Sequence, residues 1–422
     1  MNRNSEELAL LQAGVAAHNR GDLKQAEADY RNVLALSPHN PDALHLLGFL
    51  AFQSGFATQA ISLIEDAIEI SPNQPLFYNN LASVYRSIGD SEKTIFAYRK
   101  SVRLNGSDPD ILNDLGNLLR DSSKVKKDIK ILAEARKFIR KAIKINPTRA
   151  PYHNNLGNVL RDLDPLHLGA ARKSYSRALK LDPTLSGVTS NLGLLAQMES
   201  KFDEAEKLFK EAIAQEPGDA EALNNYAQFL EEKKCLDDAI SYFEKAEKLD
   251  PGNYAIGLNK ARCLMNIRRD QDALDAFQHL MELDPYRYEA FWNFAITLRK
   301  LERVREAKRF VGEALEHFPK NINLRHELAS IHVLVCEIQE AAHLLQEIVD
   351  EVGEGKILVG GAGVYATLGI VYLVTGTPEQ VMEMFAMALA LDPDNPDVNV
   401  NYALSLLSLG KLKQGWECYK NR

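Results

Sequence analysis

Asparagine recurs in this sequence in the same place of successive 34-residue stretches. A primary amide donates and accepts hydrogen bonds at once, so it can hold a peptide backbone of any sequence. A row of amides at constant rise suits an extended chain, and the pattern therefore predicts a peptide-contacting row. The alternative is that each amide only bonds a neighbouring helix. The residues, with one aspartate in the same place, are Asn80, Asp114, Asn155, Asn191, Asn225, Asn259, Asn293 and Asn401.

Other residues that could do chemistry do not assemble into a catalytic or cofactor site. Gly361, Gly363 and Ala366 match the glycines of a dinucleotide-binding loop, but such a loop needs a strand before it and a βαβ unit around it. The residues that follow keep the 34-residue pattern, so we interpret the glycines as an inter-repeat loop. Gly355-Lys356 lacks the glycine and hydroxyl partners of a phosphate-binding loop. We predict that the chain is not an enzyme and holds no cofactor.

The four cysteines, Cys235, Cys263, Cys336 and Cys418, stand far apart and form no CxxC pair, and the ten histidines form no HExxH pair. No metal site is therefore predicted, and the cysteines are interpreted as reduced thiols. The first residues carry two acids and one arginine before a short apolar run, which is the wrong pattern for a secretory signal. These features predict a cytoplasmic protein.

Prolines recur at 34-residue intervals, and this repeat predicts the helices that position the asparagines. Twelve residues before most of these prolines stands an alanine, such as Ala26 or Ala171, and four residues later a bulky one, such as Tyr30 or Tyr175. An apolar residue followed by Gly or Ala marks the other half of each stretch. This is the pattern of two amphipathic helices, in which small residues allow close approach and proline ends the second helix. The prolines are Pro38, Pro72, Pro183, Pro217, Pro251, Pro285 and Pro319, with Pro147 and Pro393 after insertions.

This pattern resembles the tetratricopeptide repeat family, whose unit is a 34-residue helix-turn-helix. The resemblance implies an all-α fold, a right-handed superhelical solenoid in which the first helix of each repeat lines the inside. We expect a single array over residues 1–422, with about eleven complete repeats from residue 7 to 395 and a partial twelfth over 396–422. The repeats start near Glu7, Pro41, Pro75, Pro109, Ala150, Ser186, Ala220, Tyr254, Tyr288, Ile322, Ala362 and Pro396.

The array departs from the pattern at a few places. Insertions near 122–130, 164–168 and 356–361 are each expected to lengthen a helix or loop without breaking the stack. Gly106 and Gly353 replace the proline, and Lys260 takes an apolar site. The uncharged stretch 357–378 is long enough to span a bilayer, but the repeat pattern runs through it, so no membrane span is predicted.

The asparagine row also resembles the ladder in the repeat region of O-linked N-acetylglucosamine transferases, where such amides hold an extended substrate. The resemblance rests on the motifs Asn-Asn-Leu-Gly at 154–157 and Asn-Asn-Leu-Ala at 79–82. The two-carboxylate clamp of chaperone-binding repeats is not expected, because no repeat has the lysine that it needs one position before the asparagine.

A basic segment interrupts an otherwise acidic chain. Residues 120–149 hold eleven Lys or Arg against three Asp or Glu, an excess of +8 in a chain of net charge −8. The cations could form a docking patch for an acidic protein or a lipid headgroup, or only a solvated helix face. Nucleic acid is not expected, because the chain as a whole is acidic and phosphate binding needs a basic surface. The residues are Lys124, Lys126, Lys127, Lys130, Lys137, Arg140, Lys141 and Lys144.

The chain ends on the second helix of the partial repeat, with Trp416 and Tyr419. This ending resembles the last repeat of bacterial proteins in which such an array leads into a glycosyltransferase-type domain. If exposed, the two aromatic residues could drive self-association; the alternative is that both pack inward.

Two hypotheses about function follow. The first is a scaffold that binds extended segments of partner proteins in its concave groove. The second is the substrate-recognition region of a glycosyltransferase whose catalytic domain is not in this chain. Both predict protein or peptide partners.

Overall fold

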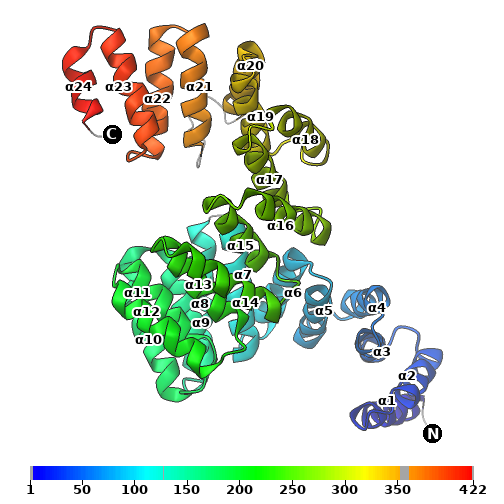
Figure 1. Cartoon of the computed structure of the whole chain (residues 1–422). Coiled ribbons are helices and arrows are strands. Elements are labelled where there is room, and N and C mark those ends of the chain that lie inside the picture. The colour runs from blue at the N-terminus through cyan, green and yellow to red at the C-terminus, as the bar shows by residue number, and fades with distance from the viewer. Residues whose placement is uncertain (1–2, 127, 352–360, 421–422) are drawn as a thin grey trace. The chain divides into compact units, whose positions relative to one another are not determined.

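The computed structural model describes residues 3–126, 128–351 and 361–420, and in these ranges it contains helices and turns but no strand. Contacts divide the chain into two units, Met1–Pro217 and Gly218–Arg422. Each unit is a succession of antiparallel helix pairs in which every helix packs against the next one along the chain (Figure 1). The all-α class and the two helices per repeat are confirmed. The single array across both units stays a prediction.

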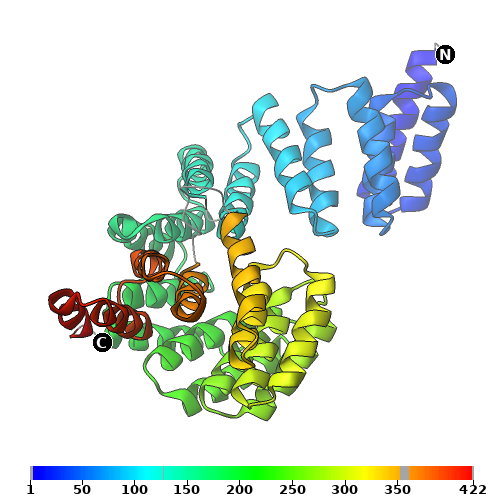
Figure 2. The same ribbon diagram turned by 90° about the horizontal axis from the view of Figure 1, so that it is seen from above.

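The first unit holds six repeats. Figure 2 shows the antiparallel helices of its first repeats, in blue, side by side. The helices are α1 (Arg3–Asn19), α2 (Leu23–Leu36), α3 (Pro41–Gln53), α4 (Ala57–Ile70), α5 (Pro75–Ser87), α6 (Ser91–Leu104), α7 (Pro109–Lys126), α8 (Ile129–Ile145), α9 (Ala150–Leu163), α10 (Leu168–Leu181), α11 (Val188–Met198) and α12 (Phe202–Gln215), with a short 3-10 helix, η1 (Pro165–His167), before α10.

The second unit continues the same alternation within the described residues. Its helices are α13 (Ala220–Glu232), α14 (Leu236–Leu249), α15 (Tyr254–Asn266), α16 (Asp270–Leu283), α17 (Tyr288–Lys300), α18 (Val304–His317), α19 (Ile322–Leu334), α20 (Ile338–Asp350), α21 (Ala362–Thr375), α22 (Pro378–Leu391), α23 (Pro396–Ser408) and α24 (Leu412–Tyr419).

The first helices begin where the sequence predicts repeats to start, except that α1 begins four residues early and α11 two residues late. Local chemistry fixes these starts. Before α3, for example, the Asn40 side chain accepts a hydrogen bond from the Ala43 amide, and Pro41 takes the first helical position, where its missing N–H costs nothing.

The small and large residues of the pattern meet inside each helix pair. A Cβ atom built on Gly157 would come within 2.5 Å of the Tyr175 ring, and one on Gly193 within 2.8 Å of the Phe209 ring. Both rings are fully buried. The glycines therefore let the first helix lie directly against an aromatic ring of the second, and the same contact recurs between Gly14 and Tyr30 and between Gly369 and Phe385.

The first two insertions lengthen elements, as expected. Around 122–130 the helices α7 and α8 reach 18 and 17 residues, and around 164–168 the added residues form η1. The third insertion and Gly353, Gly355 and Lys356 lie outside the described residues, apart from Gly361. The interpretation of the glycine motif as a loop is wrong in one respect. Gly363 and Ala366 lie inside α21, because the first helix of this repeat begins at Ala362 as the repeat pattern predicts. A Cβ atom built on Gly363 would lie 3.0 Å from the His326 ring.

Among the residues that the structure describes, no helix is long and apolar enough to cross a bilayer.

Candidate functional site

The predicted asparagines share one position in the repeat. We number each repeat from the starts given above, so that the asparagine row stands at position 6 of the first helices. In four cases Nδ2 of this asparagine lies at hydrogen-bond distance from the residue at position 5 of the preceding repeat. These inter-repeat amide bonds join Asn80 to His45 Nε2 (2.8 Å), Asn155 to Asn113 Oδ1 (2.9 Å), Asn191 to Asn154 Oδ1 (3.2 Å) and Asn259 to Asn224 Oδ1 (3.1 Å).

Two other members of the row, Asn293 and Asn401, differ because of the residue at position 5 of the preceding repeat. Leu258 and Ala366 precede Asn293 and Asn401 in this place, and neither side chain can accept a hydrogen bond. Asn293 instead donates to the backbone oxygen of Glu289 at 2.7 Å. Asn293 and Asn225 are only 7% and 8% exposed, so they offer little surface to a ligand.

One equivalent contact involves no asparagine. Thr367, at position 6, lies with Oγ1 2.9 Å from Nε2 of His326, at position 5 of the preceding repeat. Sequence reasoning missed this pair because it searched for amides. The sequence could have indicated the pair, because Thr367 and His326 stand at positions 6 and 5 of consecutive repeats.

Arginine at position 12 makes a second kind of contact between repeats, which the sequence analysis also missed. Arg86 pairs with Asp114 (Nη1 to Oδ2, 3.2 Å), and Arg161 Nη1 donates to Asn191 Oδ1 (3.0 Å). Arg299 pairs in the same way with Glu327. In each pair the partner is position 6 of the following repeat, so position 6 can be held from position 5 or from position 12.

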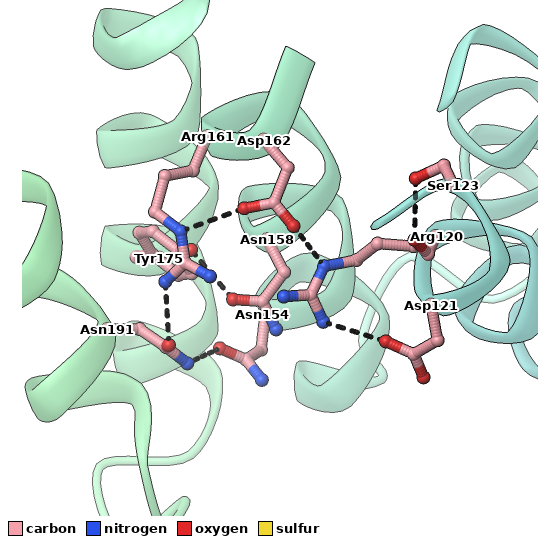
Figure 3. A network of polar contacts seen from close by, with 9 residues as sticks. All are labelled: Arg120, Asp121, Ser123, Asn154, Asn158, Arg161, Asp162, Tyr175 and Asn191. Atoms are coloured by element: carbon pink, nitrogen blue, oxygen red, sulfur yellow. Dashed lines mark hydrogen bonds and ion pairs between the residues drawn. The ribbon is translucent and has the colours of Figure 1, made fainter. Parts of the chain in front are cut away.

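Figure 3 shows where both contacts converge in the first unit. Asp162 accepts from Arg120 Nε at 2.6 Å and from Arg161 Nε at 3.2 Å, and Arg161 reaches on to Asn191. The side chains of Arg120, Arg161 and Asp162 are 11–18% exposed. Two guanidinium groups thus share one mostly buried carboxylate across the first helices α7, α9 and α11, which rigidly aligns three consecutive repeats.

Burial changes the proton affinity of four groups in these contacts. It lowers the pKa of His45 and of His326 to about 4, because the charged imidazolium loses its hydration. It raises the pKa of Asp114 and of Glu327, and the neighbouring arginines Arg86 and Arg299 only partly oppose this. Asp114 cannot donate as the asparagines do. Asn79 stands at position 5 of the preceding repeat, and its Oδ1 atom is buried with no hydrogen-bond partner among the residues that the structure describes.

An open groove lies between α13 and α15 in the second unit, with a volume of about 470 Å³. Gln228 and Glu232 stand three and seven residues after Asn225, and Arg262 and Asn266 stand three and seven after Asn259, so groove and amides share one helix face. The groove is lined by Gln228, Glu231, Glu232, Lys234, Leu236, Arg262 and Asn266.

The predicted basic patch lies on the other helix of its repeat. Lys130, Lys137, Arg140, Lys141 and Lys144 are exposed on α8. Lys127 and the side chains of Lys124 and Lys126 lie outside the described residues.

The two aromatic residues near the end differ in exposure. Trp416 is 56% exposed, whereas Tyr419 is half-buried and packs edge-on against the indole with ring centroids 5.8 Å apart. The alternative in which both pack inward is therefore wrong for Trp416. Self-association through this surface stays a prediction.

The described residues contain no group of three or more His, Cys, Asp or Glu that could hold a metal ion. Cys235, Cys263, Cys336 and Cys418 are free thiols.

The fold and these contacts define a helical repeat protein whose repeats are joined through fixed polar positions. Comparison with known families gives the same answer: residues 17–84, 76–108, 190–254 and 232–295 match family models described as tetratricopeptide repeat. These residues form tetratricopeptide repeats, as the sequence pattern predicted.

Individual relatives match only parts of the chain. The uncharacterized protein ycf37 of Pyropia yezoensis is 30% identical over 97 residues, which cover 23% of this chain and 50% of that protein. Cellulose synthase operon protein C of Pseudomonas fluorescens (strain SBW25) is 37% identical over 82 residues, 19% of this chain and 6% of that protein. The chain thus spans half or less of the curated relatives it matches.

Among solved structures, yeast Tom70 is similar over 99% of this chain and 92% of its own, with a TM-score of 0.53 and 16% identity. At this identity the likeness concerns the fold alone. It agrees with an α-solenoid built from helix pairs.

Proposed function

We propose that this protein is an interaction scaffold that holds extended segments of partner proteins against the first helices of its repeats. Tetratricopeptide repeats support a role in protein interaction, and the extended-peptide mode is the part that we add. The observation that carries it is the groove between α13 and α15, which is polar, open and about 470 Å³ in volume.

The chemistry of the groove fits a peptide backbone. Asn259 does not line the groove itself but lies one turn before Arg262 on the same helix face. One of its N–H groups bonds Asn224, which leaves its second N–H and its carbonyl oxygen for a ligand. Arg262 is exposed beside it and adds donors that can reach backbone carbonyls. A groove with both donors and acceptors binds an extended chain with little demand on its side chains.

The experiment must separate ligand binding from the bracing of repeats, so it should leave the amides in place. We suggest selecting ligands for the full chain from a library of unstructured peptides and measuring Kd by fluorescence anisotropy. The combined substitutions Gln228→Ala and Arg262→Ser should weaken binding about tenfold or more, since they remove polar contacts from the groove. Lys245→Ser on the second helix α14 is the matched control and should bind like the wild type.

Two outcomes would reject the proposal. One is that no peptide is selected by the folded chain. The other is that the groove variant and the α14 control bind every selected peptide equally well.

The glycosyltransferase hypothesis stays a prediction, as does the cytoplasmic location. A coding sequence that continues into a transferase domain, or a transferase gene beside this one, would support it.

A further inference from the structure

The second helices of the fourth and fifth repeats carry cations at three equivalent positions. Counted from the small residues Ala135 and Ala171, these positions are two, six and nine residues further on. They hold Lys137, Lys141 and Lys144 in α8 and Lys173, Arg177 and Lys180 in α10. All six side chains are exposed. Because residues spaced by three and four lie on one face of a helix, each helix presents a row of positive charge.

Packing does not require this composition. In α16 the same positions, counted from Ala273, hold Asp275, His279 and Glu282. In α12 they hold Lys207, Glu211 and Ala214. The repeat thus accepts acidic, neutral or basic residues here, and the run of six cations is particular to α8 and α10.

The charge of this face is not neutralised within the protein. In the described part of the chain, none of the six cations forms an ion pair. The helix α10 contains no acidic residue, and the single acid of α8, Glu134, is bonded to Arg99. A shallow hollow of about 530 Å³ on α10 is lined by Arg172, Lys173, Ser176, Arg177, Lys180 and Gly169.

Two exposed apolar side chains stand at the N-terminal ends of these two helices. Ile129 is the first residue of α8 and is 64% exposed, and Leu166, in η1 just before α10, is 93% exposed. Arg136, the eighth residue of α8, contacts the short helix that contains Leu166, because its Nη1 lies 3.2 Å from His167 Nε2. Both helices also pack against α9, so the two basic rows stand on the second helices of consecutive repeats.

We propose that this face of α8 and α10 docks peripherally on an anionic lipid bilayer. Lysine and arginine near such a surface are attracted by its negative potential. Exposed isoleucine and leucine beside them can enter the interface, and the two contributions add. A soluble acidic peptide would match the cations but would leave both apolar side chains without a partner.

The test is flotation of the full chain with vesicles of phosphatidylcholine alone and with about 30 mol% phosphatidylserine. The wild type should float only with the anionic vesicles at about 0.1 M salt and should be released at about 0.5 M salt, where charges are screened. Lys141→Glu with Lys144→Glu, and separately Arg177→Glu with Lys180→Glu, should each weaken binding about tenfold or more. Ile129→Ser with Leu166→Ser should weaken it about threefold or more.

The chain offers a matched control at the same repeat positions. Lys245→Glu with Lys248→Glu changes the same two positions of α14 by the same charge and should bind like the wild type. Circular dichroism should show unchanged helicity in all four variants.

Failure of the wild type to float with anionic vesicles would overturn the proposal, and so would an equal loss in the α14 variant. If the serine variant floats like the wild type and the charge reversals abolish binding to soluble polyglutamate as well, the face serves an acidic protein instead of a bilayer.

Discussion

Asn259 Nδ2 lies 3.1 Å from Asn224 Oδ1 and so connects the first helices of two consecutive repeats. Asn224 is buried, so its oxygen would lose hydration without receiving another donor if the bond were absent. The amides that the sequence predicted as ligand contacts therefore also join neighbouring repeats. Only the amide N–H and carbonyl groups that are not used in these inter-repeat bonds remain for a ligand.

Replacement of Asn259 by Ala should destabilise the second unit by about 1–2 kcal/mol, because the buried oxygen of Asn224 loses its donor. Urea unfolding of the full chain, followed by circular dichroism, measures this. Asn401→Ala is the control, since Ala366 offers it no acceptor, and it should cost less than about 0.5 kcal/mol. Equal losses in the two variants would show that the inter-repeat bond contributes nothing.

The sequence was sufficient to place position 6 but not its partner. Prolines and small residues recur along the chain, so the starts of helices such as α5 and α13 could be predicted within a residue. The bond from Asn155 to Asn113 depends instead on how two helices 42 residues apart align when they pack. One residue of difference at position 5, as with Leu258, removes the contact. The pairing of positions 5 and 6 could therefore not be predicted before the packing of the helices was known.

The pair of Asn80 and His45 should make the first unit sensitive to acid. Burial lowers the pKa of His45 to about 4, below its usual value of about 6.5. The unfolded chain therefore takes up the proton more readily, and this share of stability is present above pH 6.5 and lost as the pH falls towards 4. Protonation would also leave Nε2 unable to accept from the Asn80 amide.

His45→Asn keeps an acceptor at position 5, as in Asn113 and Asn154, but removes the titrating group. Between pH 7.5 and pH 5, the free energy of unfolding of this variant should fall less than that of the wild type, by about 2 kcal/mol. Urea midpoints at the two pH values give the comparison. His39→Asn, in the exposed turn before α3, should behave like the wild type. Parallel curves for wild type and His45→Asn would refute the assignment.

Arg299 should contribute more to the free energy of unfolding than its own exposure suggests, because its partner Glu327 is buried. Arg299→Met would leave that carboxylate unpaired and should cost about 3 kcal/mol at pH 7.5. Burial already raises the pKa of Glu327, so the folded state binds the proton more readily than the unfolded chain. The deficit should therefore shrink as the pH falls through the carboxyl range.

The double variant Arg299→Met with Glu327→Leu removes both charges and should recover most of the loss. Urea unfolding at pH 7.5 and pH 5 measures all three proteins. A deficit that is the same at both pH values, or that persists in the double variant, would mean that the arginine acts through packing alone.

Gly193 tests the helix contact from which the whole array is built. A Cβ atom there would lie 2.8 Å from the Phe209 ring, which is fully buried. Gly193→Ala should therefore destabilise the first unit by about 1–3 kcal/mol, although alanine is the better helix former. Gly169→Ala is the matched control, because Gly169 also lies in a helix, α10, but has no atom within 4 Å of the added carbon. There the same substitution should stabilise by about 0.5–1 kcal/mol. Opposite signs in urea unfolding would tie the effect to the ring, whereas stabilisation in both variants would show that the helix pair can separate without cost.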